Sequence, residues 1–170
     1  MKNDPYKKAG VDIKAGNILV DKIRRDVVGT FDKNVLTNLG GFAGLYSLPR
    51  GLKEPVLVAC TDGVGTKVAL AKKNSYLRSI GQDLVAMCLN DMVTSGASPL
   101  FFLDYFASSK LDVKETSLII KGIANACKKS NCSLIGGETA EMPNHYIGKN
   151  FDLAGFSVGI VEKKLIIGCS

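Results

Sequence analysis

Apolar, strand-like runs alternate with helix-like segments from residue 55 onward, and this order constrains the fold more than any other feature of the sequence. Runs rich in β-branched and aromatic residues predict buried strands at residues 55–61, 99–107, 132–137 and 151–164. Apolar residues at helical spacing predict helices at residues 79–95 and 112–129. The order strand, helix, strand, helix, strand, strand predicts an α+β fold, namely a mixed four-stranded sheet (β-α-β-α-β-β) with helices packed on one face.

The residues before this alternation are expected to form smaller elements. Residues 1–16 contain Pro5 and two glycines without sustained periodicity, which predicts an extended arm. Asn17 is a plausible N-cap of a short amphipathic helix whose outer face is basic. The glycine-flanked run at residues 40–51 is typical of another strand. We therefore expect one domain at residues 17–170, preceded by an N-terminal arm at residues 1–16.

Composition excludes several classes of protein. Hydrophobic residues make up 46% and charged residues 22% of the 170 residues, which are the proportions of a globular protein. No segment approaches the roughly 18 consecutive apolar residues of a membrane span. The residues after Met1 are polar and do not resemble a secretory signal. We therefore expect a cytoplasmic protein without a membrane partner.

Charge and cysteine content exclude further classes. The net charge of +6 comes from scattered lysines and arginines, and no basic run is interleaved with aromatic residues. A nucleic-acid partner is therefore not expected. The odd number of cysteines and their mostly apolar surroundings favour free thiols at Cys60, Cys88, Cys127, Cys132 and Cys169. With a single histidine in the chain, a structural zinc site is not expected.

The segment TDGVGTK, residues 61–67, follows the first predicted strand directly and contains groups suited to binding a phosphate. Gly63 and Gly65 allow the backbone to approach a ligand closely. Thr66 offers a hydroxyl group, and Lys67 offers a positive charge. The spacing of these residues matches neither the dinucleotide-binding glycine motif nor the P-loop. Taken alone, the segment is also compatible with a simple glycine turn.

Three acidic residues lie where their carboxylates can hold a magnesium ion. Asp62 ends the first strand, Asp91 interrupts the apolar face of the helix at 79–95, and Glu138 follows the glycine pair that ends the third strand. Magnesium usually binds a few carboxylates together with water and substrate phosphates. Phosphoryl transfer depends mainly on positioning and charge neutralisation, so these acids indicate nucleotide-phosphate binding. The residues alone leave open a surface acid at Asp91 and a solvated acidic loop containing Glu138 and Glu141.

The sequence leaves the roles of two other polar residues, Asp104 and His145, open. Asp104 lies within an apolar strand, and alternation places it on the face opposite Leu103 and Tyr105. It is either a partner of a site residue or an edge charge. His145 lies in a polar loop and is more typical of a surface histidine than of a catalytic one.

Four segments occur in the order AGVDIKAGN, TDGVGTK, GQDLVAMCLNDMVTSGASPLFFLDYFA and IGGETAEMPNHY. Together they resemble aminoimidazole ribonucleotide synthetase, the cyclo-ligase of purine biosynthesis, over about residues 6–163. The resemblance implies ATP-dependent cyclisation of formylglycinamidine ribonucleotide. In that reaction the amide oxygen is phosphorylated, a nitrogen attacks the activated carbon, and phosphate leaves.

The resemblance also implies roles for individual residues. Asp62, Asp91 and Glu138 are expected to hold Mg²⁺ and the phosphates of ATP, and Asp62 and Lys67 are expected to act in catalysis. The expected contacts of the nucleotide are Gly63, Val64, Gly65, Thr66, Lys67, Asn90, Gly136, Gly137 and Thr139. The expected contacts of the substrate are Asp12, Lys14, Asn17 and Glu141, with the arm folded over the active site. Without the resemblance, the arm residues suggest only a solvated terminus.

Members of this family are dimers in which the sheets of two N-terminal domains join in a barrel, so the resemblance implies a homodimer. The family also has a C-terminal domain that this chain lacks, so we expect the chain to correspond to the N-terminal half. Asn144 and His145 depart from the glycine and apolar residue that are more usual there. The alternatives are another ATP-using superfamily member, similar to selenophosphate synthetase or thiamine-phosphate kinase, and a non-catalytic dimerisation module.

Overall fold

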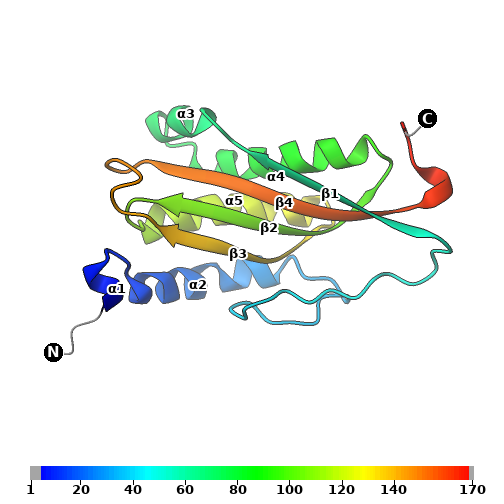
Figure 1. The fold of residues 1–170 in the computed structure, drawn as a ribbon, viewed down its shortest axis with the longest axis horizontal. Helices are drawn as coiled ribbons and strands as arrows, with labels where there is room; N and C mark the ends of the chain where they lie inside the picture. Colours follow the sequence, from blue (N-terminus) through cyan, green and yellow to red (C-terminus); the bar gives the residue numbers. More distant parts are fainter. Residues whose placement is uncertain (1–4, 169–170) are drawn as a thin grey trace.

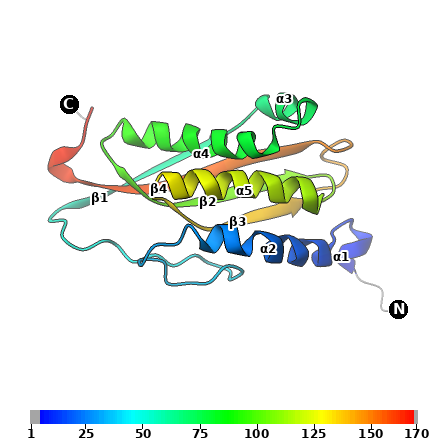
Figure 2. The ribbon, with the colours of Figure 1, turned by 180° about the vertical axis from the view of Figure 1, so that it is seen from behind.

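The computed structural model describes residues 5–168, and its strands form one mixed sheet that helices cover on one face (Figures 1 and 2). The strands are β1 (Pro55–Gly63), β2 (Ser98–Ser108), β3 (Ser133–Glu141) and β4 (Phe151–Glu162). The helices are α1 (Pro5–Lys8), α2 (Ile13–Val28), α3 (Lys67–Lys73), α4 (Leu77–Val93), α5 (Val113–Lys129) and the short 3₁₀ helix η1 (Lys163–Leu165). The predicted α+β class and four-stranded mixed sheet are confirmed.

The strand order in the sheet is β1-β4-β2-β3. Strand β4 is antiparallel to both β1 and β2, whereas β2 and β3 are parallel and are connected through α5. Strands β1, β2 and β3 therefore run in the same direction, and their C-terminal ends meet at one end of the sheet (Figure 1). This arrangement brings residues 61–67 and the segment 136–141 to the same end of the molecule.

The core lies between the sheet and the helices α4, α5 and α2 (Figure 2). Strand residues alternate in burial, so that Phe102 and Leu153 are fully buried beneath the helices. Helices α4 and α5 cross closely because each has a glycine at the contact. A Cβ atom at Gly81 would collide with the backbone of Ile119, and one at Gly122 would collide with the backbone of Arg78.

The ends of the two central helices match their sequence signals. Asp112 is the N-cap of α5, and its Oδ1 accepts hydrogen bonds from the backbone N–H groups of Lys114 and Glu115, both at 3.0 Å. Gly96 follows the end of α4 with φ = +80°, a conformation that favours glycine. The predicted start of α5 and the predicted stop after α4 are therefore confirmed.

The N-terminal region differs from the prediction. Residues 5–8 and 13–16, predicted to be extended, are helical, whereas the helix predicted after Asn17 is present as the rest of α2; residues 1–4 of the predicted arm lie outside the described residues. The N-cap is Asp12 instead of Asn17, because the Asp12 side chain accepts a hydrogen bond from the N–H of Ala15 at 3.1 Å. The N-cap therefore lies five residues earlier than predicted, and helix α2 begins at Ile13.

The segment 40–51 was predicted to form a strand and does not. It is irregular, with a single bridge between Val35 and Tyr46. The segment is instead fixed by side chains: the Tyr46 hydroxyl donates to Asp32 at 2.8 Å, and the Asp32 N–H donates to Ser133 Oγ at 3.1 Å. Burial and the hydrogen bond to Asp32 raise the pKa of Tyr46 to about 12. These contacts attach the irregular segment to the start of β3.

The predicted third strand is longer than its apolar run. Strand β3 continues through Glu141, since Gly136 to Glu141 pair in register with Leu103 to Ser108 of β2. Glu138 and Glu141 therefore lie in a strand. The acidic-loop interpretation, which placed them in a loop, is not supported.

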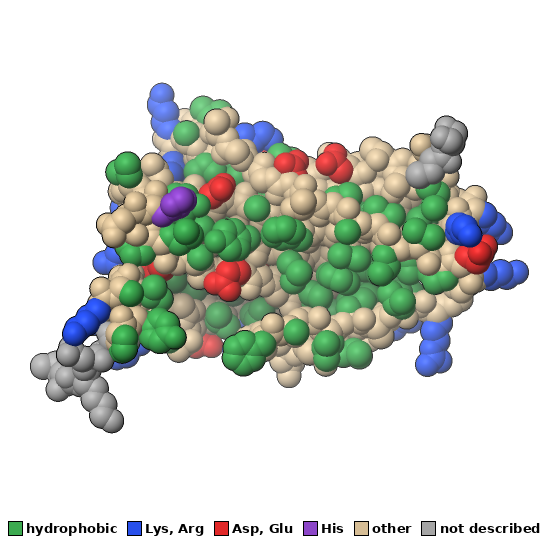
Figure 3. Space-filling model, viewed as in Figure 1, with side chains coloured by type: hydrophobic (Ala, Val, Ile, Leu, Met, Phe, Trp, Pro, Cys, Tyr) green, Lys and Arg blue, Asp and Glu red, His purple; other side chains and the backbone are tan. Residues whose placement is uncertain are grey.

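The face of the sheet opposite the helices is largely hydrophobic (Figure 3). Leu57 and Phe156 are exposed on it, and Leu103 and Tyr105 are half-buried. Among the described residues, no helix combines the length and apolar character needed to cross a membrane. The cysteines at positions 60, 88, 127 and 132 are free thiols, and Cys169 lies outside the described residues.

Candidate functional site

The segment TDGVGTK forms a tight turn between β1 and α3. Asp62 Oδ1 accepts a hydrogen bond from the N–H of Gly63 at 2.7 Å, and the N–H of Val64 donates to the carbonyl of Leu153 at 3.1 Å. Gly65 has φ = +55°, so the turn requires a residue that tolerates the left-handed region. Val64 is buried, and its backbone carbonyl accepts a hydrogen bond from the N–H of Lys67 at 3.3 Å. Both earlier interpretations, turn and ligand site, are therefore compatible with this geometry.

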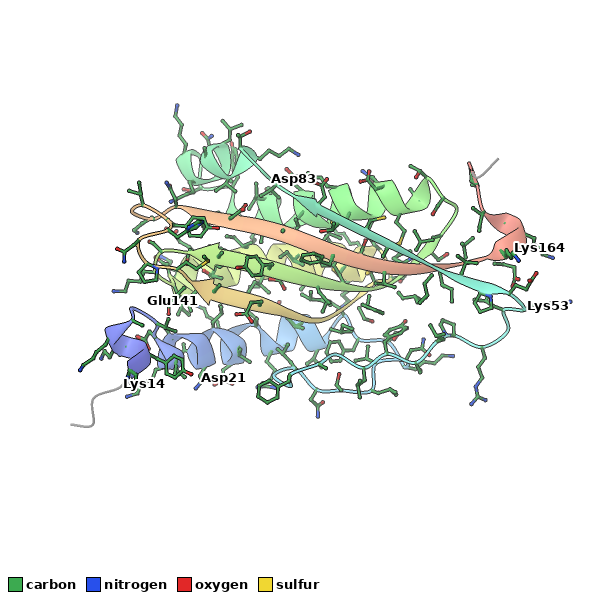
Figure 4. All side chains as sticks on the ribbon, viewed as in Figure 1. Lys14, Asp21, Lys53, Asp83, Glu141 and Lys164 are labelled. Carbon is green, nitrogen blue, oxygen red and sulfur yellow. The ribbon has the colours of Figure 1, made fainter. Side chains whose placement is uncertain are left out.

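Lys67 lies along the outer face of α4. Its Nζ is 3.7 Å from Asp83 Oδ2 and 3.8 Å from the sulfur of Met87. Both charged side chains are half-exposed, at 51% each, so the ion pair contributes little to stability. Lys67 can therefore exchange this partner for a phosphate at low cost. Asp83, which Figure 4 labels beside α3, was not among the predicted site residues.

Asp62 on β1 and Asp91 on α4 both act electrostatically on Cys88, which lies on α4 itself. Burial raises the pKa of the Cys88 thiol to about 11, and the negative charges of Asp62 and Asp91 contribute to this shift. Burial, together with the charge of Asp91, also raises the pKa of Cys60. Both carboxylates therefore lie within electrostatic range of the same thiol.

Asp91 does not interrupt the apolar face of α4, which corrects the sequence interpretation. Cys88 and Met92 are fully buried, whereas Asp91 and Asn90 are exposed. The buried face of α4 contains Ile80, Leu84, Cys88 and Met92 together with Val85 and Leu89, and Asp91 lies outside it. Asp91 therefore has no burial cost to offset and is accessible to a ligand together with Asn90.

Glu138 lies at the opposite edge of the sheet from Asp62. In the strand register, Gly63 faces Ala154, Ala154 faces Tyr105, and Tyr105 faces Glu138. Three strand spacings separate the two edges, or roughly 14 Å. Within residues 5–168, no group of three His, Cys, Asp or Glu side chains is placed to hold a metal ion. The predicted magnesium ligands Asp62, Asp91 and Glu138 therefore do not lie together within one chain. Their role in binding magnesium stays a prediction.

Glu141 joins three elements at this end of the molecule. Its Oε2 accepts from the N–H of Asp12 at 2.5 Å, and its Oε1 accepts from the N–H of Leu111 at 2.7 Å. Figure 4 places Lys14 and Glu141 at the same end, whereas Lys53 and Lys164 lie at the opposite end. Asp12 serves as a helix cap, and Lys14 and Asn17 are exposed on α2. The structure therefore brings the predicted substrate contacts together, and their role in binding stays a prediction.

A pocket of about 690 Å³ lies along the open edge of β3. We call it the β3-edge pocket; its walls are formed by α2, the loop 38–44, and residues 103–105 and 134–139 of β2 and β3. Gly136, Gly137 and Thr139 line it together with Glu138, whereas residues 63–67 do not. Sequence reasoning missed the contribution of the loop 38–44 because its glycines were assigned to a strand edge. Their abundance in NLGGFAG is the signal that can identify a close-packed loop.

Asp104 is a buried acid at the floor of this pocket. The predicted alternation is confirmed, but Asp104 is not an edge charge, because β2 is a central strand. The side chain is 7% exposed, and its burial, assisted by the charge of Glu138, raises its pKa to about 7. A Cβ atom at Gly137 would collide with the Asp104 carboxyl group, so glycine is required there. Across residues 5–168, no ion pair reaches Asp104.

Solved structures of several proteins share this fold. Thiamine-monophosphate kinase from Stenotrophomonas maltophilia K279a is 22% identical, with a TM-score of 0.65, over 87% of this chain and 43% of that chain. Hydrogenase maturation protein HypE in complex with ATP is 14% identical, with a TM-score of 0.61, over 89% of this chain and 41% of that chain. PurLQS from Thermotoga maritima is 19% identical, with a TM-score of 0.51, over 72% of this chain and 20% of that chain. The chain thus spans less than half the length of each of these chains.

These likenesses define a class of α+β domain by its fold alone. The sequence then identifies the family within that class. The family model of AIR synthase related protein, N-terminal domain, matches residues 43–161, which is more than half of the chain. The chain belongs to this family.

Proposed function

We propose that the chain is the ATP-binding N-terminal half of a cytoplasmic aminoimidazole ribonucleotide synthetase, which cyclises formylglycinamidine ribonucleotide with ATP. The observation that carries the proposal is the β3-edge pocket, because the GGET segment of the family-like motif IGGETAEMPNHY lines it. Family membership supports the same assignment. The pocket volume of about 690 Å³ is in the range of nucleotide-sized ligands.

In this proposal, the turn at residues 63–66 and Lys67 bind the phosphates of ATP. The exposed backbone at Gly65 and Thr66 begins α3, and N–H groups at a helix start favour an anion. Lys67 leaves Asp83 and neutralises part of the phosphate charge. Asn90, exposed one residue from Asp91, contributes a neutral hydrogen-bonding group.

Asp62 and Asp91 fit a magnesium ion, and Glu138 does not fit the same ion within one chain. A site with few carboxylates leaves room for water and phosphate oxygens, which is the usual magnesium environment. Glu138, roughly 14 Å from the β1 edge, must act on a second ion or from a second chain. When bound, the ion would neutralise phosphate charge during phosphoryl transfer.

A homodimer is part of the proposal. The hydrophobic face of the sheet (Figure 3) carries exposed Leu57 and Phe156, and β1 and β3 are edge strands that end the sheet. Exposed apolar faces and free strand edges favour association with another sheet. Two copies that join these faces form the barrel that the family resemblance implies. Light scattering of the purified protein measures the mass directly, and a monomer at micromolar concentration would contradict the dimer.

The test of the proposed function uses the full-length protein with ATP, magnesium and formylglycinamidine ribonucleotide. Asp62→Asn should abolish magnesium-dependent phosphate release, because the amide keeps the hydrogen bond from Gly63 and loses the charge that holds the ion. The matched control is Glu54→Gln, an exposed acid that pairs with Lys163. Unchanged activity of Asp62→Asn would contradict the magnesium assignment.

Another ATP-using superfamily member is the second candidate, and the fold similarity to thiamine-monophosphate kinase favours it. Purified protein should be offered formylglycinamidine ribonucleotide, thiamine phosphate and selenide in parallel with ATP. Phosphate release or transfer with only one of these substrates decides between the candidates. A purely structural dimerisation module predicts no ATP binding in calorimetry.

A further inference from the structure

Asp104 is a buried carboxyl group within a mostly apolar part of the β3-edge pocket. Helix α2 contributes Leu19 and Ile23 to the wall, and the loop 38–44 contributes Leu39 and Phe42. Asp104 itself is 7% exposed, yet it lines the pocket. The site is therefore a slot with apolar sides and a single buried carboxyl group at its floor.

In the described part of the chain, no positive charge lies beside the Asp104 carboxyl group. The titratable groups that interact with it are Glu138 on β3 and Cys127 on α5, and neither is a cation. Arg24 on α2 points elsewhere, since it bonds the carbonyl of Leu39 and pairs with Asp21. The backbone N–H of Asp104 supplies one hydrogen bond to the carboxyl group. A carboxyl group has more acceptor sites than this bond uses, so a buried carboxyl group that lines a pocket favours a ligand that brings a further donor.

The glycines of β3 make the carboxyl group reachable. Gly137 leaves space for the Asp104 side chain, and Gly136 leaves the other face of the strand, beside Leu103, without a side chain. Because β3 is an edge strand, its outer side also presents backbone groups without a strand partner. A flat ring can therefore lie against the apolar walls while its polar edge meets Asp104 and the strand.

A flat aromatic ring with an amino group at its edge has the chemistry that this slot selects. Its faces suit apolar walls, and its amino N–H suits a carboxyl oxygen. We propose that Asp104 accepts a hydrogen bond from the 6-amino group of the adenine of ATP and thereby selects the base. This inference rests on the proposed nucleotide binding and adds the residue that recognises the ring.

The experiment compares ATP with purine riboside 5′-triphosphate, which lacks only the 6-amino group. Calorimetry with the full-length protein and magnesium should show that ATP binds about 10- to 100-fold more tightly, because the analogue leaves a buried acceptor without a donor. Asp104→Asn should keep this preference, since its amide oxygen still accepts. Asp104→Leu should reduce the preference to less than about threefold. Glu54→Gln, at the opposite end of the sheet, is the matched control and should behave as the unmodified protein.

The outcomes separate this inference from the proposed function. Equal affinity of the unmodified protein for both triphosphates, or an unchanged preference in Asp104→Leu, would overturn the role of Asp104 while nucleotide binding stands. Binding of neither triphosphate would overturn the proposed function and this inference together. If Asp104→Leu does not fold, as its thermal unfolding curve would show, the unmodified protein still tests the inference, because equal affinity for the two triphosphates would overturn it.

Discussion

Replacing Asp104 by Asn should stabilise the protein, and by more as the pH rises. Burial raises the pKa of Asp104 from its ordinary value of 3.8 to about 7. Between these values the folded state holds a proton that the unfolded state has released, so stability falls with rising pH. Below about pH 4 the group is protonated in both states and has no effect. Above about pH 7 the buried charge lowers the free energy of unfolding by its full amount. This amount is roughly 4 kcal/mol, because the pKa differs by about 3 units and each unit corresponds to about 1.4 kcal/mol.

The assay is urea unfolding of the unmodified protein and of Asp104→Asn at about pH 4 and about pH 8. The difference in unfolding free energy between the two proteins should grow by a few kcal/mol from the lower to the higher pH, since Asn carries no charge to bury. Other titrating groups are common to both proteins and cancel in this difference. Asp21→Asn, an acid with 78% of its side chain exposed, is the control and should show no such growth. A difference that is the same at both values of pH would refute the raised pKa.

Two further changes test the packing and the connections of the fold. Gly122→Ala should lower stability by about 1–3 kcal/mol, because the added methyl group meets the backbone of Arg78 where α4 and α5 cross. The control, Gly16→Ala, has open space around the added methyl group and should not lower stability. Equal thermal midpoints of the two variants would contradict the close crossing. Glu141→Ala should lower stability by about 1–3 kcal/mol, because the N–H groups of Asp12 and Leu111 lose their acceptor. Hydrogen exchange should be faster at both amides, and unchanged protection would show that other groups hold the start of α2.

Much of the fold could be predicted because its elements are buried and periodic. The core strands and helices carry apolar patterns, and Asp112 and Gly96 mark helix ends by local chemistry alone. The segment 40–51 could not be predicted in this way, since its shape depends on Asp32 and Tyr46, and on Ser133 far along the chain. Glycine-rich sequence is compatible with both a strand edge and a close-packed loop, and only the tertiary contacts distinguish them.

The candidate site was predictable in its parts but not in its arrangement. Sequence reasoning correctly expected Asp62 at the end of the first strand, whereas Glu138 lies within β3 instead of after it; the common direction of β1 and β3 places both acids toward one end of the sheet. Strand order is a non-local property, and the insertion of β4 and β2 between the two edges separates these acids. The exposure of Asp91 differs for another reason: a helical wheel has an uncertain phase when the helix is apolar over most of its surface.

The contact between Gly137 and the Asp104 carboxyl group has a consequence for related sequences. A residue with a Cβ atom at position 137 would meet both the carboxyl group and the backbone carbonyl oxygen of Asp104, so a smaller side chain at position 104 relieves only part of the collision. Glycine should therefore be retained at position 137 in relatives of this chain, even where position 104 is no longer an acid.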